Sequence, residues 1–454
     1  MSPTVPALEL VWSSAEPARI GELFCLPRAV DMPFTIGRAV EPDEEGALPL
    51  VLQQLRPCSR VETGALLDAR VSRRHVGVRL LADGGLLIER LGRGEVSING
   101  HQVERAIAEP GDIIEAVDRF AVLYTTRPAS WPESDAWARP FPFGEADRDG
   151  LVGESPAIWA LRRQIAAVGP LREHVLVHGP SGTGKELVVR ALHVASGRGS
   201  VALVARNAAT MPESLIDAEL FGNLRDYPNF GVPDRVGLLG EADHGALYLD
   251  ELGELPHALQ SRLMRVMDSG EYQRLGEARR RTCDLRIYGA TNSDPAALKH
   301  DLLARFIHRI DVPGLDECRG DIPLLARHIL RLVAREHPEL RARFFSAEGE
   351  PRLAPEFVAA VMGHSYAGHV RELIALLWRG LNESPGPLIG AAPGTMPGPA
   401  PRLLERHTLP EELTREQIVA TLAECDGVRE QAWRNLGLQS RHQLKRLLKK
   451  FDIA

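Results

Sequence analysis

The feature that most constrains this chain is a glycine-rich octet, GPSGTGKE, set between an apolar run and a helical stretch. The run HVLVHG leads into it and KELVVRALHVAS follows, and this order of strand, loop and helix is typical of phosphate-binding loops. Glycines let backbone amides converge on phosphate oxygens, the helix N-terminus adds its dipole, and the lysine supplies a point charge. The alternative is a glycine-rich turn that only caps a helix. The expected cofactor-binding residues are Gly179, Pro180, Ser181, Gly182, Thr183, Gly184, Lys185 and Glu186.

Two adjacent acids end a second apolar run, ALYL, further along the chain. Phosphoryl hydrolysis needs one carboxylate to hold Mg²⁺ and one to polarise the attacking water. Asp250 and Glu251 suit those roles in that order. A strand that ends in two acids is often only a solvated strand end. Together with the glycine-rich loop, however, the pair predicts a site for ATP and Mg²⁺ with Asp250 as the metal ligand.

The chain of 454 residues divides at two segments rich in Pro and Gly. Short apolar runs separated by Gly, Asp and Asn turns predict an all-β sandwich before the first segment. Strand-like and helical stretches alternate after it, which predicts a parallel sheet covered by helices, and the pattern becomes purely helical near residue 321. The expected boundaries are 1–127 for the sandwich, 128–150 for a linker, 151–320 for the α/β core, 321–383 for a helical lid, 384–410 for a second linker and 411–454 for a helical C-terminal domain.

Charge and cysteine usage exclude several classes of protein. Lys and Arg number 54 against 61 Asp and Glu, so the chain is acidic overall and any nucleic-acid contact must come from a local patch. The five cysteines form no CxxC pair, which argues against a zinc knuckle or a disulfide framework. We find no signal-peptide pattern and no apolar stretch of membrane-spanning length, so we expect a cytoplasmic protein without a membrane partner.

Residues 151–373 resemble the AAA+ ATPase domain of sigma-54-dependent transcriptional activators. The resemblance is carried, in order, by LVGESP (151–156), GPSGTGKE (179–186), NAA (207–209), PESLIDAELFG (212–222), EADHGALYLDE (241–251), SGEYQRLG (269–276), GATN (289–292), RGDIPLL (319–325) and GHVREL (368–373). The phosphate loop of that family also ends in GKE. Glu186, which stands where a Ser or Thr would otherwise ligate Mg²⁺, is therefore a shared feature.

This resemblance implies further roles. Asn207 would hold Glu251 until the γ-phosphate is sensed, Thr291 and Asn292 would form the first sensor, and Arg371 would contact nucleotide from the lid. Arg305 falls where the family inserts an arginine finger into the neighbouring subunit of a ring. The other finger position holds Lys299, which has no bidentate fork, so hydrolysis between subunits is expected to be weaker.

The largest departure from the family is the loop that touches sigma-54. The family motif GAFTGA is absent, and Asp226-Tyr-Pro-Asn-Phe-Gly231 occupies its register without a change of length. Pro228 fixes backbone φ where the family motif has no proline. This predicts that contact with RNA polymerase carrying sigma-54 is altered.

The C-terminal run ECDGVREQAWRNLGLQSRHQLKRLLKKF (424–451) resembles a Fis-type helix-turn-helix. From Arg429 to Lys450 there are seven Lys or Arg and one acid, a local reversal of the overall charge. A recognition helix places base-reading side chains near its N-terminus and other basic residues on phosphates. The alternative is a solvated basic helix. The expected DNA-binding residues are Arg434, Arg441, His442, Gln443, Lys445, Arg446 and Lys449.

The N-terminal piece resembles a forkhead-associated (FHA) domain. The matching runs are IGR (36–38), VSRRH (71–75) and SING (97–100). A phosphothreonine needs a guanidinium fork and hydroxyl donors on adjacent loops, which Arg38, Ser72 and Arg73 would supply. His75 and Asn99 would brace these loops.

Taken together, the fold class expected is multidomain: an all-β FHA sandwich, an α/β P-loop AAA+ core with a helical lid, and an all-α helix-turn-helix. The function expected is an ATP-dependent regulator of transcription that binds an upstream operator or enhancer. Its input would be a phosphothreonine protein or a phosphorylated segment of its own, and it would assemble into a dimer or a ring of up to six subunits. The alternatives are a non-hydrolysing repressor or sigma-70 modulator, and a scaffold that acts through FHA docking.

Overall fold

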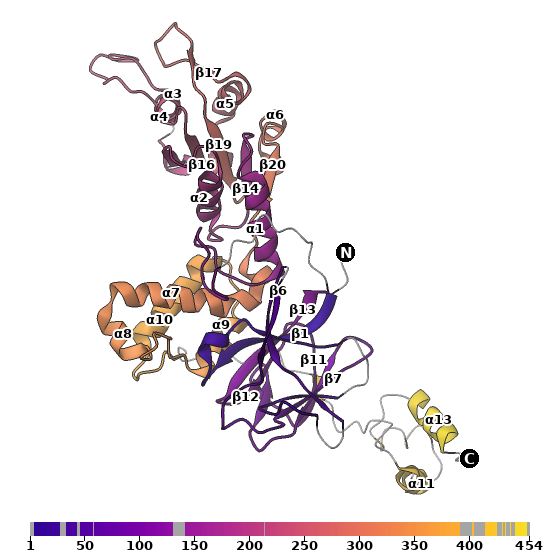
Figure 1. The fold of residues 1–454 in the computed structure, drawn as a ribbon. Coiled ribbons are helices and arrows are strands. Elements are labelled where there is room, and N and C mark those ends of the chain that lie inside the picture. The colour runs from indigo at the N-terminus through magenta and orange to yellow at the C-terminus, as the bar shows by residue number, and fades with distance from the viewer. Residues whose placement is uncertain are drawn as a thin grey trace.

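The structure, a computed structural model, describes residues 4–27, 33–42, 46–57, 59–129, 141–212, 214–390, 402–403, 414–424, 429, 432, 436 and 441–451. Figure 1 shows a β-sandwich from the N-terminal residues, an α/β layer at the other end of the molecule, and a group of helices beside the junction of the two. The short C-terminal helices lie at the far side of the sandwich.

The N-terminal part is a sandwich of two sheets around one apolar core, which includes Leu8, Leu10, Ile88, Ile98 and Val122. Short runs of Val, Ile and Leu between turns favour strands, so the β-rich N-terminal region predicted above is confirmed. The larger sheet runs β10 (His101–Gln102), β9 (Val96–Ile98), β12 (Ile113–Ala116), β13 (Phe120–Pro128), β1 (Thr4–Ser13), β2 (Leu23–Cys25), β5 (Leu52–Arg56) and β6 (Ser59–Gly64). The smaller sheet runs β21 (Arg402–Leu403), β11 (Arg105–Ala108), β8 (Leu86–Arg90), β7 (Val76–Leu80), β3 (Phe34–Ile36) and β4 (Leu48–Pro49).

The middle part contains a parallel sheet with helices on both faces, as the alternating sequence pattern predicts. Successive side chains of a strand point to opposite faces. Leu247 and Leu249 therefore pack on the side of α5 (His257–Ser269), while Ala246 and Tyr248 pack on the side of α2 (Lys185–Ala195). The strand order is β15 (Leu203–Asn207), β16 (Ala246–Asp250), β19 (Arg286–Thr291), β14 (Val175–His178) and β20 (His308–Asp311).

Helices and one hairpin complete this α/β core. The α-helices are α1 (Pro156–Val168), α2 (Lys185–Ala195), α3 (Ile216–Phe221), α4 (Leu238–Glu241), α5 (His257–Ser269) and α6 (His300–Leu303). The hairpin pairs β17 (Glu271–Tyr272) with β18 (Arg281–Thr282). Short 3-10 turns are η2 (Ala208–Thr210), η3 (Leu252–Glu254) and η4 (Pro295–Ala297), and η1 (Pro17–Arg19) belongs to the sandwich.

A helical lid follows the core through the 3-10 segment η5 (Leu315–Asp321). Its helices are α7 (Ile322–Glu336), α8 (Pro338–Phe344), α9 (Pro355–Gly363) and α10 (His369–Glu383). Apolar residues recur along α7 and α10 at helical spacing, and Leu330, Leu373 and Leu377 are fully buried between them. The helical pattern predicted from about residue 321 is therefore found.

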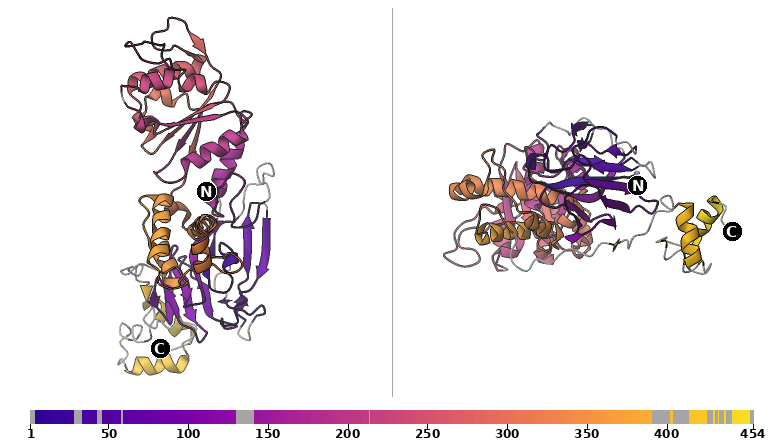
Figure 2. Two further views of the ribbon diagram at one scale, coloured as in Figure 1. Left: turned by 90° about the vertical axis from the view of Figure 1, so that its left-hand side faces the viewer. Right: turned by 90° about the horizontal axis from the view of Figure 1, so that it is seen from below.

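The sandwich packs directly on the lid. Both views in Figure 2 show the orange lid helices against the indigo and violet strands. Val11, Trp12 and Leu123 of the sandwich share one apolar cluster with Ile322 and Ala326 of α7. Strand β1 is consequently buried on both of its faces, one toward the sandwich core and one toward the lid.

The described part of the predicted first linker is not a free connection. Residues 141–150 pack between the sandwich, the lid and α1, and Phe141 stacks on Trp159 with ring centroids 5.8 Å apart. Residues 130–140 lie outside the described part of the chain. This segment packs because its aromatic residues bury apolar surface. Its content of Pro and Gly predicted a linker and did not reveal that burial.

The C-terminal residues include α11 (Arg415–Glu424) and α13 (Arg441–Lys450). Ile418, Ala432, Leu436, Leu444 and Leu447 form a separate small core. In the part of the chain that is described, no helix has the length and apolar character needed to cross a membrane.

Candidate functional site

The glycine-rich loop forms a cradle between β14 and α2. Gly184 caps α2 in the left-handed region at φ +91°, where glycine carries no steric penalty. A Cβ on Gly182 would lie 2.3 Å from the Gly368 carbonyl, so a side chain there would push the lid away. The Leu187 amide makes the first bond of α2, to the Gly184 carbonyl at 2.9 Å, so the Lys185 and Glu186 amides before it can receive phosphate oxygens.

Lys185 occupies the centre of this cradle. Its side chain is 7% exposed, and Nζ donates to the carbonyl oxygens of Gly179 at 2.9 Å and Pro180 at 3.2 Å. Burial lowers the pKa of the Lys185 ammonium, while Glu251 and Asp250 oppose that shift. A buried cation facing two carboxylates is the electrostatic arrangement that a nucleotide with its metal requires.

The two acids end β16 on the same side of the sheet as the cradle. Asp250 has the same parity as Ala246 and Tyr248 and so faces α2. The Asn292 amide donates to Glu251 Oε2 at 3.4 Å, and Glu251 itself has φ +50°. β19, which ends in buried Thr291, separates β16 from β14, and the Gly179 amide donates to the Thr291 carbonyl at 3.3 Å.

The asparagine expected to hold Glu251 has a different partner here. Asn207 Nδ2 lies 3.4 Å from Asp250 Oδ2, and its Oδ1 accepts from the Ala209 amide at 2.9 Å. β15 and β16 are paired so that Asn207 stands beside Asp250, which explains why the amide reaches the first acid of the pair.

Sequence reasoning missed one further residue at this site. Tyr248 is buried on the face that packs against α2, and burial together with the nearby charge of Asp250 raises the pKa of the phenol. The signal was present in the sequence, because a residue two positions before an acid on a strand shares its face. Tyr248 therefore lies next to Asp250 on the same face of β16.

The start of α10, in the lid, contacts the glycine-rich loop. The Val370 amide at the start of α10 donates to the Gly182 carbonyl at 3.1 Å. Arg371 follows it, with its Cβ 3.3 Å from the Cβ position of Gly182, and its charge lowers the pKa of Lys185. The structure thus brings Arg371 to the phosphate loop.

The two finger-position residues bond to α5 of their own chain. Lys299 Nζ donates to Ser261 Oγ at 2.7 Å, and Arg305 Nη2 donates to Asp268 Oδ2 at 3.0 Å. Neither residue is brought into the cradle within one chain. Glu186, at the first turn of α2, pairs with Arg190 on the exposed face of that helix.

The loop at residues 226–231 projects from the far end of the α/β core, beside the β17–β18 hairpin (Figure 1). Phe230 at its tip is 96% exposed. Tyr227 packs against Gly276, and the Gly231 amide donates to Asp226 Oδ1 at 2.7 Å. The loop thus exposes one aromatic side chain on a turn that a hydrogen bond within the loop closes.

The candidate phosphothreonine-binding residues lie on two loops of the sandwich that are bonded to each other. The Arg38 amide donates to the Ser72 carbonyl at 3.3 Å, and the Ala39 amide donates to the Arg73 carbonyl at 3.1 Å. A Cβ on Gly37 would lie 2.1 Å from the Arg73 carbonyl, so glycine is needed for the two loops to approach. Arg38 and Arg73 are exposed and Ser72 is half-buried.

Two further residues hold turns of the sandwich in place. His75 Nδ1 accepts from the Ser72 amide at 3.1 Å, and burial lowers the pKa of the imidazole. Asn99, which is half-buried and has φ +53°, accepts from the Ile113 amide at 2.9 Å and donates to Asp112 Oδ1 at 2.8 Å. His75 thus holds the loop of Ser72, and Asn99 joins its own turn to the start of β12.

The basic residues of the C-terminal helix are only partly described. In α13, Lys445, Arg446 and Lys449 are exposed, while Leu444 and Leu447 are buried in the small core. Arg434 lies outside the described residues, as do the side chains of Arg441, His442 and Gln443. In its described part, helix α13 is therefore amphipathic, with basic side chains toward solvent and leucines in the small core.

The cradle, acid pair and lid define the class: a P-loop core of the AAA+ type. The family described as "Sigma-54 interaction domain" matches residues 151–315. The transcriptional regulatory protein ZraR of Escherichia coli K12 is 34% identical over 317 residues, covering 66% of this chain and 69% of that protein. The transcriptional regulatory protein GlrR of the same organism is 36% identical over 253 residues, covering 54% and 55%. The solved structure of NtrX from Brucella abortus in complex with ATP has 28% identity and a TM-score of 0.47, covering 68% and 70%.

The chain belongs to the family of sigma-54-type transcriptional regulators. The resemblance noted in residues 151–373 is confirmed for the family and for the AAA+ core.

Proposed function

We propose that this protein is a regulator of transcription that binds and hydrolyses ATP, is controlled by a phosphothreonine ligand and binds DNA. The observation that carries the proposal is the meeting of Lys185, Asp250 and Glu251 at the carboxyl end of one parallel sheet, under Arg371 of the lid. Ligands of open α/β sheets bind at that end of the strands.

The residues fit ATP with Mg²⁺. Lys185 and the first amides of α2 would hold the β- and γ-phosphates, and Asp250 would hold the metal. Mg²⁺ neutralises charge that develops on the phosphates. Glu251 would orient and polarise the attacking water, with Asn207, Thr291 and Asn292 as the groups that sense the γ-phosphate.

Hydrolysis would depend on assembly of several subunits. Lys299 and Arg305 would act on a neighbouring subunit, which requires them to leave Ser261 and Asp268 of their own chain. The ATPase rate per subunit should therefore rise with protein concentration. Glu251→Gln should retain ATP binding and lose turnover by on the order of 100-fold or more. A rate per subunit that is independent of concentration would contradict assembly, and undiminished turnover in Glu251→Gln would contradict the site.

The input would be a phosphothreonine bound at Arg38, Ser72 and Arg73. A phosphate of about −2 charge suits two exposed guanidinium groups beside a hydroxyl on loops held by backbone bonds. The phosphothreonine can belong to a partner protein or to this chain. Pull-down with phosphothreonine peptides, with Arg38→Ala as the control, tests the assignment.

The output would be DNA binding by the C-terminal residues. Exposed Lys445, Arg446 and Lys449 on α13 support a nucleic-acid surface in a chain that is acidic overall. A truncated chain ending at residue 402 should lose this binding. Undiminished affinity in that variant would contradict the proposal.

The family relationship supports RNA polymerase with sigma-54 as a partner, but the contact loop is replaced. Asp226 would lose hydration in an apolar contact, and Pro228 restricts the poses of the tip. We therefore propose that the protein does not remodel sigma-54 polymerase by the usual route. The test is open-complex formation on a sigma-54 promoter with purified protein and ATP, and efficient opening that depends on hydrolysis would refute it.

A second candidate function is a regulator that binds ATP without efficient hydrolysis, acting as a repressor, a sigma-70 modulator or a scaffold. Its support is the lysine at position 299, bound to Ser261 of its own chain. The ATPase titration above separates the two functions.

A further inference from the structure

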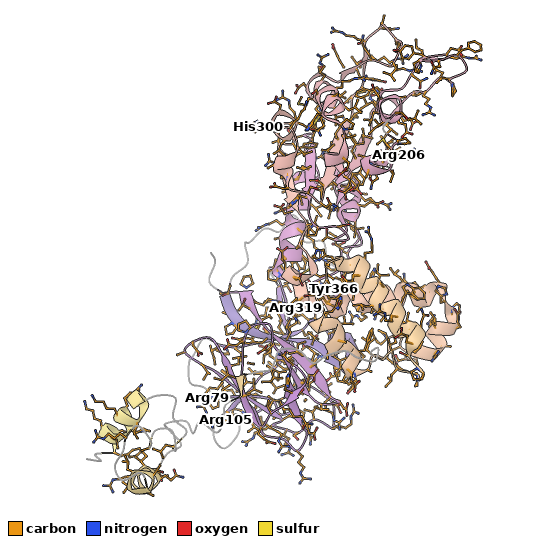
Figure 3. The ribbon with its side chains drawn as sticks, turned by 180° about the vertical axis from the view of Figure 1, so that it is seen from behind. Arg79, Arg105, Arg206, His300, Arg319 and Tyr366 are labelled. Carbon is orange, nitrogen blue, oxygen red and sulfur yellow. The ribbon has the colours of Figure 1, made fainter. Side chains whose placement is uncertain are left out.

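The sandwich contacts both sides of the joint between the α/β core and the lid. This joint is η5, Leu315–Asp321, which follows the last strand of the parallel sheet and leads into α7. We refer to it below as the hinge. Figure 3 labels Arg319 of the hinge and Tyr366 of the lid where they lie close to the sandwich.

On the lid side the contact is apolar and extensive. Val11, Trp12, Ile113 and Leu123 are each at most 7% exposed and pack on α7 and its neighbours. Trp12 Nε1 also donates to the Leu353 carbonyl at 3.2 Å. Full burial of side chains of this size is typical of a docked surface rather than a transient encounter.

A single lid arginine fixes a second point. Arg327 of α7 is almost fully buried, and Nη1 donates to the carbonyls of Pro17 at 3.2 Å and Ala18 at 3.4 Å in the sandwich turn η1. Its Nη2 donates to the Gly144 carbonyl at 3.1 Å, in the segment that leads to the α/β core. Arg327 thus ties lid, sandwich and entry segment together.

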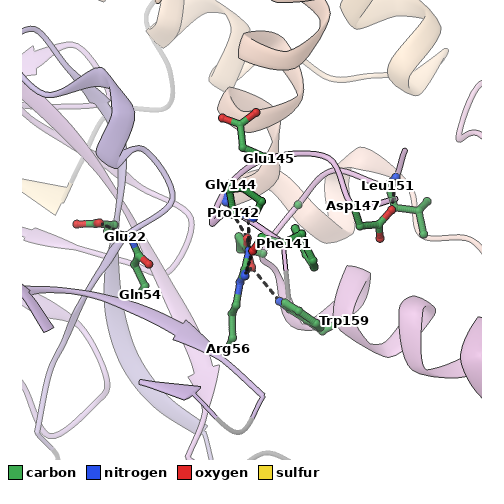
Figure 4. A network of polar contacts seen from close by, with 12 residues as sticks. Glu22, Gln54, Arg56, Phe141, Pro142, Gly144, Glu145, Asp147, Leu151 and Trp159 are labelled. Atoms are coloured by element: carbon green, nitrogen blue, oxygen red, sulfur yellow. Dashed lines mark hydrogen bonds and ion pairs between the residues drawn. The ribbon is translucent and has the colours of Figure 1, made fainter. Parts of the chain in front are cut away.

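On the core side the contact is made by Arg56 of β5. Its Nε donates to Glu154 Oε2 at 2.9 Å and its Nη1 donates to the Phe141 carbonyl at 2.7 Å. The guanidinium lies 4.2 Å from the Phe141 ring centroid. Figure 4 shows Arg56 extending from the sandwich to Phe141 and Pro142, next to Trp159 of α1.

At the hinge itself the sandwich presents a buried ion pair. Glu9 of β1 bonds Arg127 at 2.8 Å, and a Cβ on Gly320 would lie 1.9 Å from Glu9 Oε2. The next residue, Asp321, accepts from the amides of Glu154 at 2.6 Å and Ser155 at 3.0 Å. The hinge is therefore enclosed by sandwich residues on one side and by the start of the core on the other.

The hinge is bonded to the same turn of the lid that contacts the phosphate loop. The Leu315 amide donates to His369 Nδ1 at 3.2 Å, and the adjacent Val370 amide donates to the Gly182 carbonyl. A nucleotide bound between the loop and the lid would leave when the lid moves away from the loop, and such a movement would turn on the hinge.

We propose that the sandwich is a brace within the chain that joins the core to the lid across the hinge and so slows the release of bound nucleotide. The inference rests on the nucleotide site proposed above. The bridging residues are Arg56 toward the core and Trp12 toward the lid, with Glu9 against the hinge. The sandwich therefore has a task at the nucleotide site that is separate from recognition of a phosphothreonine.

The test measures release of a fluorescent ADP with Mg²⁺ from the full chain by stopped flow. Arg56→Gln should speed release at least fivefold, and Trp12→Phe, which keeps the packing but loses the bond to Leu353, should speed it less. Arg60→Gln, an equal change of charge on exposed β6 of the same sheet, should leave it unchanged. Equal release rates in Arg56→Gln and Arg60→Gln would overturn the proposal.

Hydrogen exchange separates failure of the brace from failure of the nucleotide site. In protein without nucleotide, the amides of Glu154, Ser155 and Leu315 should exchange faster in Arg56→Gln than in the wild type, and Arg60→Gln should match the wild type. Unchanged exchange would overturn the brace even if the wild type binds no nucleotide. Faster exchange with unchanged release would show that the hinge does not govern release, which also overturns it.

Discussion

The two sites of this protein that we propose to bind phosphate are built differently. The loop before α2 buries a single lysine among its own carbonyls and adds the start of a helix. The loops of the sandwich expose two arginines and fix their backbones to each other. One site is enclosed by a lid, and the other faces solvent.

The difference suits the ligand that we propose for each site. A lysine is a compact point charge that suits a chain of phosphates whose bond is to be broken, and enclosure strengthens each charge interaction. An arginine fork reads the geometry of one phosphate, and an open site allows a peptide to come and go. Charge alone does not distinguish the two sites; burial and side-chain geometry do.

The largest expected effect is at the enclosed site. Lys185→Ala should weaken ATP binding by about 3 kcal/mol, on the order of 100-fold, because a buried charge on the phosphates is lost. Phosphopeptide affinity should not change. Lys449→Ala, the same loss of charge on exposed α13, serves as the matched control. Isothermal titration with ATPγS measures the effect, and equal affinity in Lys185→Ala and the wild type would contradict the cradle.

The next effect is at the open site. Arg38→Ala should weaken a phosphothreonine peptide by about 2 kcal/mol, roughly 30-fold, and Arg38→Lys should recover only part of it because the fork is absent. Fluorescence anisotropy with a labelled peptide measures both. If Arg38→Lys binds the peptide as tightly as the wild type, this site also uses only a point charge. The contrast with the lysine of the enclosed site would then be lost.

The open site should also respond to acid. Burial holds the pKa of His75 below its unfolded value, so the unfolded chain takes up a proton first as pH falls below about 6.5. Stability of the neutral, Ser72-bound form is therefore lost toward low pH. Peptide affinity should fall about fivefold between pH 7 and pH 5.5, in part because the phosphate itself gains a proton near pH 6. His75→Asn keeps a hydrogen-bond acceptor for the Ser72 amide. Its peptide affinity should fall only by the part of the loss that comes from protonation of the phosphate. A pH profile identical to that of the wild type would show that His75 does not contribute to the response to acid.

The smallest expected effect concerns the proposed DNA-binding surface of α13. There the DNA phosphates would contact exposed basic side chains of a helix. Lys449→Ala should weaken all DNA sequences by about twofold to threefold and lower the slope of affinity against salt by about 1. Filter binding at several salt concentrations measures it. A loss confined to one DNA sequence would instead make Lys449 a base-reading residue.

Local sequence patterns were enough to predict the elements that carry the proposed nucleotide site. The surroundings of the octet at Gly179–Glu186 predicted a strand, a turn and a helix, and the ALYLDE run predicted a strand followed by the acid pair. Asn207 shows the limit of this approach, because register between β15 and β16 decides that it meets Asp250 rather than Glu251.

The docking of the sandwich on the lid was not predicted. Along β1, Leu8 and Leu10 face the sandwich core, and Val11 and Trp12 face the lid across an irregularity in register after Leu10. Apolar residues on both faces of a strand indicate that both faces are covered. They do not indicate which elements cover them. The contact of Arg56 with Glu154 joins residues 98 positions apart, and no local pattern encodes it.

The most direct test of the account is a titration of one protein preparation with both ligands. ATPγS and a phosphothreonine peptide, selected from an oriented peptide library, should each bind with a stoichiometry of one per chain, and saturation with one should leave the site for the other open. Lys185→Ala should lose only the nucleotide and Arg38→Ala only the peptide. Displacement of the peptide by ATPγS, or loss of both ligands in either variant, would contradict two separate phosphate sites.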